Sequence, residues 1–150
     1  MAPRLVALYN HWCHADCIRV FIREKVPDRE RDPDLPAALA ELGDLSSSMS
    51  RLVVWYSLIY VVVEGYIELE LRDEELDKLL ANEELVGSLR RFRNSVFHYQ
   101  PELIPKKHVE FLKSEGSEHW MRALNRAFDR FFLVNLPIRE QLAQFREGSS

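Results

Sequence analysis

The strongest constraint on the fold is one long apolar run near the middle of the chain. Residues 52–63 read LVVWYSLIYVVV and are bounded by Arg51 and Glu64. The run lacks the alternation and turn signals of strands, and an all-round apolar helix is typical of the centre of a bundle. It is also too short to cross a bilayer, which needs about 20 residues. We therefore expect a central helix that begins near residues 46–50 and continues to about Leu71.

Shorter elements are expected before this central helix. Apolar residues at helical spacing predict a first helix from about Pro3 to Lys25. The charged, proline-rich residues 27–36 predict a loop. Residues 37–42 predict a short turn of helix that Gly43 would end, because glycine commonly terminates helices.

After the central helix, two residues with capping side chains predict helix starts. Asp73 is expected to cap a short helix over residues 74–81. Asn82 is expected to cap a longer helix that runs to about Tyr99. That helix should stop there because Pro101 disfavours helical geometry in the residue before it.

The remaining segment completes an all-helical pattern. A short helix or loop over residues 105–113 precedes a long helix that Ser117 caps and Pro137 breaks. The fold class is therefore all-α, an antiparallel helical bundle of four to five main helices with short connecting helices. The 150 residues, 47% hydrophobic and 29% charged, are typical of one globular domain. We expect that domain to span residues 1–150, with a disordered tail over about residues 147–150.

Two of these helices carry apolar residues at the spacing of a buried face. On the first helix the expected stripe consists of Val6, Tyr9, Cys13, Cys17, Val20 and Phe21. On the last helix the expected core residues are Trp120, Leu124, Ala127, Phe128 and Phe131.

Cys13 and Cys17 lie in the sequence HWCHADC, which could suggest a zinc site. A structural zinc site takes four ligands, usually from two separated pairs, and the chain has no second cysteine pair. We therefore expect reduced cysteines packed in the core, no metal and no cofactor. The N-terminus lacks the pattern of a signal peptide, so we expect a cytoplasmic protein outside the membrane.

The helix that Asn82 begins is the most informative segment. On a helical wheel its core face gathers Leu85, Leu89, Phe92, Val96 and Tyr99. Its outer side carries Arg90, Arg91, Asn94, Phe97 and His98. Arg93 lies at the border, about 80° from the core direction, and its long stem can bend either way.

Arginine and histidine together suffice to cleave RNA without a metal. A guanidinium binds phosphate through two parallel hydrogen bonds, and an imidazole moves protons near neutral pH. Because the net charge is −4, contact with nucleic acid would depend on this local strip. A solvated helix face without function would carry the same residue types. Arg93 and His98 lie about 140° apart; they converge if the arginine wraps round, if the helix end distorts before Pro101, or if a second copy faces the first.

The segment from Arg93 to His98, RNSVFH, resembles the Arg-polar-x3-His signature of the HEPN superfamily. The resemblance covers about residues 46–132, and its specific part is these six residues. It implies a bundle of four or five helices that pairs as a homodimer, with the two motifs meeting in a cleft. Many members are metal-independent ribonucleases of toxin–antitoxin, defence or RNA-processing systems. Others have lost activity and serve as binding modules.

Carried over by position, the resemblance assigns roles to four residues. Arg93 would stabilise the scissile phosphate, Asn94 would orient the site, and His98 would be the general acid or base. Glu64, which interrupts the apolar run, is the candidate for the acidic residue that members often add from a neighbouring helix. Glu64 could equally be a carboxylate that pairs with Arg90 or Arg93 for structural reasons.

Further residues could extend this surface. Arg90 and Arg91 are the candidate substrate-binding residues. Lys106, Lys107 and His108 could add to the basic surface, although a solvated turn is the simpler interpretation.

These observations predict a metal-independent endoribonuclease in which the 2′-OH of RNA attacks the adjacent phosphate. The resemblance implies a homodimer, with an antitoxin or a nucleotidyltransferase as the kind of partner. The alternative is an inactive helical module that binds a nucleotide, RNA or a protein partner.

Overall fold

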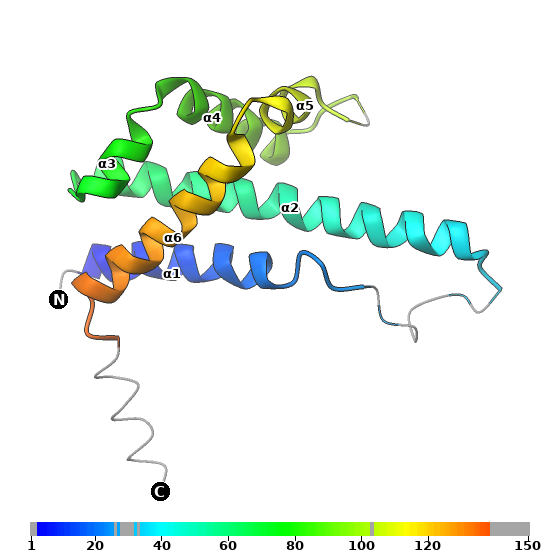
Figure 1. Cartoon of the computed structure of the whole chain (residues 1–150), viewed down its shortest axis with the longest axis horizontal. Helices are drawn as coiled ribbons and strands as arrows, with labels where there is room; N and C mark the ends of the chain where they lie inside the picture. Colours follow the sequence, from blue (N-terminus) through cyan, green and yellow to red (C-terminus); the bar gives the residue numbers. More distant parts are fainter. Residues whose placement is uncertain (1–2, 26, 28–31, 33, 103, 139–150) are drawn as a thin grey trace, which may run out of the picture.

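The computed structural model describes residues 3–25, 27, 32, 34–102 and 104–138, and this part contains six helices and no strand (Figure 1). The helices are α1 (Pro3–Val20), α2 (Ala37–Glu68), α3 (Glu74–Leu80), α4 (Glu83–Phe97), α5 (Lys106–Lys113) and α6 (Ser117–Asn135). The predicted all-α fold is confirmed. The predicted tail at residues 147–150 lies outside the described residues.

Helix α2 is the central helix on which the others pack. Helix α1 lies antiparallel along it, α4 and α5 cover another side, and α6 crosses the bundle diagonally (Figure 1). Helix α1 approaches α2 closely at Gly65, where an added Cβ atom would lie 2.5 Å from Cδ1 of Leu8. A glycine at this point of α2 therefore lets α1 pack closely.

Helix α2 begins earlier than the sequence predicts. It is continuous from Ala37, so the expected short helix and the expected central helix are one element. Gly43 lies inside this helix and does not end it. Pro36 is the N-cap residue, with φ −55° and ψ 138°, and no side chain caps this helix start. The predicted start near residues 46–50 is wrong, while the end at Glu68 lies close to the predicted Leu71.

The predicted caps of α3 and α4 are confirmed. The Asp73 carboxylate accepts hydrogen bonds from the backbone N–H groups of Glu75 and Leu76. The Asn82 side chain accepts one from the N–H of Leu85 at 3.1 Å. The cap of α6 differs, because Gly116, with φ 73°, precedes the helix and Ser117 is its first residue. Helix α6 ends at Asn135, two residues before Pro137, as predicted.

The core is aromatic and centres on α2, α4 and α6. The predicted core residues of α6 are all buried. On α1, however, the fully buried residues are Leu8, Trp12 and Ala15. The predicted stripe is right only for Tyr9 and Cys13, which are half-buried against the core, and wrong for its other members, which are exposed. Two members of that stripe, Val20 and Phe21, are 57% and 52% exposed. The sequence of α1 has two apolar faces, and the face that contains Leu8 is the one that packs against α2.

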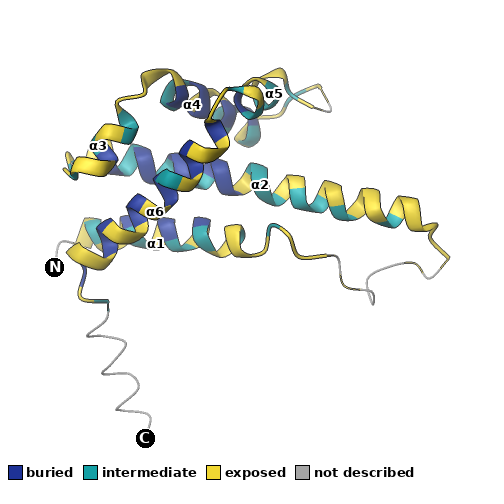
Figure 2. Cartoon of the chain, in the orientation of Figure 1, coloured by how far each residue is buried: buried dark blue, intermediate teal, exposed yellow. Residues whose placement is uncertain are grey.

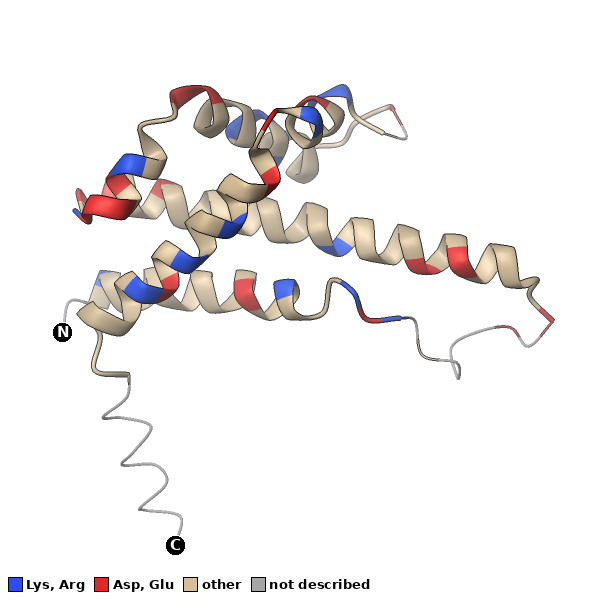
Figure 3. Ribbon diagram, in the orientation of Figure 1, with Lys and Arg blue, Asp and Glu red and all other residues tan. Residues whose placement is uncertain are grey.

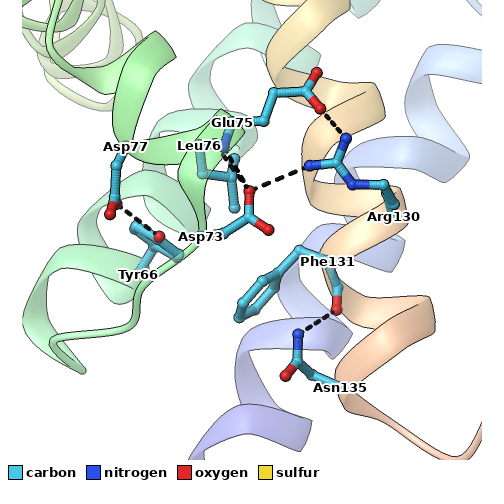
Figure 4. A network of polar contacts seen from close by, with 8 residues as sticks. All are labelled: Tyr66, Asp73, Glu75, Leu76, Asp77, Arg130, Phe131 and Asn135. Atoms are coloured by element: carbon cyan, nitrogen blue, oxygen red, sulfur yellow. Dashed lines mark hydrogen bonds and ion pairs between the residues drawn. The ribbon is translucent and has the colours of Figure 1, made fainter.

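Polar contacts fasten α3 to its neighbours (Figure 4). Arg130 of α6 pairs with Glu75 and, at 3.2 Å, with Asp73. The Tyr66 hydroxyl of α2 donates a hydrogen bond of 2.8 Å to Asp77. Burial raises the pKa of Tyr66, so its hydroxyl remains the donor.

The two halves of α2 differ in burial (Figure 2). All of its buried residues lie between Trp55 and Tyr66, and residues 37–54, named here the α2 arm, contain none. Among the described helices only α2 is long and apolar enough to cross a membrane, and 39% of its most apolar stretch is buried. Its C-terminal half serves as the core helix of the bundle, which is the commoner role of such a sequence.

Candidate active site

The guanidinium of Arg93 lies between two oxygen acceptors. Its Nη2 donates to Oε2 of Glu64 at 3.0 Å, which joins α4 to α2. Its Nη1 donates to Oδ1 of the neighbouring Asn94, also at 3.0 Å. The structure thus brings together three of the four predicted catalytic residues. The Arg93 side chain has bent toward α2, one of the two directions open to it at the border of the helix face.

Two aromatic rings flank the same guanidinium. The Cζ atom of Arg93 lies 5.8 Å from the centre of the Tyr60 ring and 5.9 Å from that of Phe97. Both distances are within the range of cation–π attraction. The Arg93 Nε is buried and has no hydrogen-bond partner among the described residues. The hydrogen bonds and the ring contacts therefore hold the guanidinium in place. Its Nε donor remains unsatisfied, and 29% of the Arg93 side chain is exposed.

The surroundings of Tyr60 keep its hydroxyl protonated. Burial raises the pKa of Tyr60, and the Glu64 carboxylate raises it further, while Arg90 and Arg93 lower it. A protonated hydroxyl on the ring that flanks the guanidinium keeps a hydrogen-bond donor at this site.

His98 lies just beyond the helix that carries Arg93. Helix α4 ends at Phe97, earlier than the predicted Tyr99, and His98 is extended with φ −120° and ψ 140°. The two residues therefore no longer share one helical wheel, which corresponds to the distorted helix end considered above. The His98 side chain is exposed, and no described residue forms a hydrogen bond or ion pair with its imidazole. Its backbone carbonyl accepts a hydrogen bond from the Gln100 side chain at 3.1 Å.

The other basic residues near α4 have different environments. Arg90 and Arg91 are exposed on the outer side of the helix, as predicted. Lys106 and Lys107 are also exposed, at the start of α5. His108 is half-buried, and its ring lies 4.5 Å from that of Phe92. The interpretation of residues 106–108 as a solvated turn is therefore right for the exposed Lys106 and Lys107 and wrong for His108, which packs on Phe92 in the first turn of α5.

Charges of both signs are spread over the described helices (Figure 3). The strip on α4 is thus a local cationic surface on a protein of net charge −4. This arrangement favours recognition of one or two phosphates over non-specific coating of a long nucleic acid.

The sequence did not predict two contacts at this site, those of Arg93 with the rings of Tyr60 and Phe97. Tyr60 precedes Glu64 by one helical turn and Phe97 follows Arg93 by one turn, so each flanks the ion pair from its own helix. The apolar Phe97 on the outer half of the predicted helix was the available signal. Tyr99, in contrast, was expected in the core and is 92% exposed, because the helix ends before it.

The cysteines and histidines of α1 form no comparable centre. Both cysteines are free thiols, with Cys13 half-buried and Cys17 exposed, so the prediction that both pack in the core is wrong for Cys17. The His11 and His14 rings lie 6.4 Å apart. Among the described residues, no three metal-binding side chains gather in one place.

Comparisons of this chain with protein-family models, with curated proteins and with solved structures found no match. The class of the protein is therefore argued from its own residues.

Proposed function

We propose that the protein is a metal-independent endoribonuclease of the HEPN kind, with Arg93 and His98 as its principal catalytic residues. The observation that carries the proposal is the anchored Arg93 guanidinium, together with an exposed histidine five residues later in the sequence whose imidazole is unpaired among the described residues. An anchored guanidinium can stabilise charge on a phosphate without reorganising during the reaction. An exposed imidazole near neutral pH can exchange protons with the substrate.

In the proposed reaction, His98 accepts the proton of a ribose 2′-OH. The freed oxygen forms a bond to the adjacent phosphorus while the bond from phosphorus to the 5′-oxygen breaks. The leaving oxygen takes up a proton from a protonated imidazole, which the His98 of a second copy can supply, and this gives a 2′,3′-cyclic phosphate and a 5′-OH end. Arg93 stabilises the negative charge that develops on the phosphate, and Asn94 holds the guanidinium in position. Arg90 and Arg91 bind flanking phosphates.

The reaction needs a proton donor and a proton acceptor on opposite sides of one phosphate. One copy of the chain offers one histidine in this region with a free imidazole. We therefore propose a homodimer in the cytoplasm that completes the site. An antitoxin or a nucleotidyltransferase partner would fit the same proposal.

An assay with matched oligonucleotides tests the chemistry. The purified protein is incubated in EDTA with a mixed-sequence RNA and with the same sequence in 2′-deoxy form. We expect cleavage of the RNA alone, unaffected by EDTA, with 2′,3′-cyclic phosphate ends. Intact RNA, or equal cleavage of the DNA, would contradict the proposal.

A second candidate function follows from the Glu64 contact. In this structure the charge of Arg93 is already paired, and paired arginines of this kind also occur in proteins without activity. The chain would then be a helical module that binds a nucleotide, RNA or protein through the same strip. RNA binding without cleavage, unchanged in His98→Ala, would favour this candidate.

A further inference from the structure

Phe97 places an exposed aromatic ring at the proposed site. It is the last residue of α4, and 56% of it is exposed. A single exposed apolar side chain is common on protein surfaces and by itself indicates no site. Phe97 differs because the Cζ atom of Arg93 lies over its ring, 5.9 Å from the ring centre. The ring therefore contacts the guanidinium that is proposed to bind phosphate.

The neighbours of Phe97 along α4 are polar or cationic. At the spacings that bring side chains together on a helix, these neighbours are Asn94 and Arg93, and Arg90 lies one turn further back. Arg90 is exposed, and 29% of the Arg93 side chain is exposed. The centres of protein–protein interfaces are depleted of charged residues. This setting therefore favours an anionic ligand over a second protein surface.

A nucleotide carries both groups that this surface can bind. Its phosphate accepts hydrogen bonds from a guanidinium, and its base has a flat aromatic face that stacks on phenylalanine. One ribose separates a phosphate from its own base. An RNA strand with a phosphate at Arg93 can therefore bring a base to a ring that contacts the same guanidinium.

Phe97 suits this role better than the other exposed aromatic residue of the segment. Tyr99 is 92% exposed and follows the end of α4. Phe97 is helical, and its ring already contacts Arg93. Less conformational freedom is therefore lost when a base stacks on Phe97.

We propose that Phe97 is a base-binding residue, on which a nucleobase of the RNA stacks while an adjacent phosphate pairs with Arg93. The proposal rests on the proposed function, because it takes RNA as the ligand of this strip, but it does not require cleavage. Every base has an aromatic face, so stacking tolerates different sequences. The base on Phe97 has to be unpaired, because the bases of a duplex are already stacked on one another.

Fluorescence anisotropy with a mixed-sequence single-stranded RNA tests the base contact. The parent and all variants carry His98→Ala, so that the RNA stays intact. We expect Phe97→Leu to weaken binding by at least about fivefold, because leucine has no aromatic face. Phe97→Trp keeps an aromatic face and should bind within about twofold of the parent.

The control variant is Phe21→Leu. Phe21 is also an exposed aromatic residue, at 52%, and it follows α1, where its carbonyl accepts a hydrogen bond from Arg51 of the α2 arm. We expect this variant to bind the RNA like the parent. Circular dichroism checks that all variants remain folded.

A strand without bases separates stacking from a structural role of Phe97. An abasic oligonucleotide of the same length keeps the ribose-phosphate backbone and removes every base. We expect the parent and Phe97→Leu to bind this strand with similar affinity. If Phe97 only held Arg93 in position for the phosphate, Phe97→Leu would weaken the binding of both strands alike.

Three results of these measurements would overturn the proposal. They are single-strand binding that Phe97→Leu leaves unchanged, an equal loss with the abasic strand, and a parent protein that does not bind single-stranded RNA. Sedimentation of Phe97→Leu shows whether the first result reflects a subunit contact, since a dimer would then dissociate. Uncut RNA in the cleavage assay contradicts the ribonuclease alone, whereas the binding measurements decide the role of Phe97.

Discussion

The Arg93 guanidinium on α4 and the Glu64 carboxylate on α2 form an ion pair of 3.0 Å at the edge of the helical bundle. Two aromatic rings flank the guanidinium, and the pair is partly open to solvent, with side-chain exposures of 29% and 44%. A phosphate that binds Arg93 therefore has to compete with a carboxylate that is already in place. The pair connects the fold with the proposed chemistry, because the guanidinium that joins α4 to α2 is the one proposed to bind the phosphate.

Removing the charge of Glu64 should strengthen RNA binding. Glu64→Gln keeps an oxygen acceptor for Arg93 but abolishes the ionic competition, and exposed ion pairs of this kind contribute about 0.2–1 kcal/mol. We expect RNA affinity to rise by up to about fivefold. Fluorescence anisotropy in a His98→Ala background, which prevents cleavage, measures the change. Weaker binding by Glu64→Gln would show that the carboxylate assists the ligand.

Removing Arg93 should affect activity far more than stability. Arg93→Ala loses a partly exposed ion pair, so we expect unfolding free energy to fall by less than about 1 kcal/mol. Loss of the guanidinium at the phosphate should slow cleavage by at least about 100-fold. Arg126→Ala, an exposed arginine on α6, is the control and should behave as wild type. A stable but fully active Arg93→Ala would remove this residue from the site.

The two glycines of α2 should respond in opposite ways to substitution. Gly65→Val places methyl groups where an added Cβ already meets Leu8, so we expect a loss of about 1–3 kcal/mol. Gly43→Ala meets nothing within 4 Å and removes a flexible residue from a helix, so we expect a gain of about 0.5–1 kcal/mol. Urea unfolding of both variants measures the two changes. A neutral Gly65→Val would mean that α1 does not pack this closely on α2.

His108 should make stability depend on pH. Burial lowers the pKa of His108 in the folded protein below its ordinary value of 6.5, so the unfolded chain takes up the proton first. The stability that neutral His108 gives the folded protein is therefore fully present above about pH 6.5. It is lost as pH falls from there through the lower pKa of the folded state. Thermal unfolding of wild type and His108→Gln from about pH 8 to about pH 5 should show a smaller decline in the variant. His119→Gln, on the exposed side of α6, should retain the wild-type decline.

The sequence predicted best those features that depend on local interactions. Asp73 and Asn82 cap helices because a side-chain oxygen bonds an N–H two or three residues away, which requires no knowledge of the rest of the chain. The long start of α2 could not be anticipated, because Gly43 is tolerated inside a helix when its neighbours favour the helical state. The buried face of α1 depends on the approach of Leu8 to Gly65, and two apolar faces in the sequence were compatible with burial.

For the site, the sequence identified residue types and left their geometry open. Glu64 had two interpretations, an acidic residue of the site or a structural partner of Arg90 or Arg93, and the structure shows its pairing with Arg93. His98 was placed on a helical wheel to which it does not belong, because α4 ends at Phe97. Tyr60 was seen as part of the apolar run, and its contact with Arg93 depends on how far apart α2 and α4 pack.

Cleavage of a mixed RNA by His98→Ala, measured beside the wild type in EDTA, tests the central claim most directly. His119→Ala is the matched control, because His119 is also an exposed histidine but lies on α6, away from the motif in the sequence. The account predicts that the wild type and His119→Ala cleave at similar rates, while His98→Ala, still folded by circular dichroism, is at least about 100-fold slower. Equal cleavage by all three proteins would contradict it.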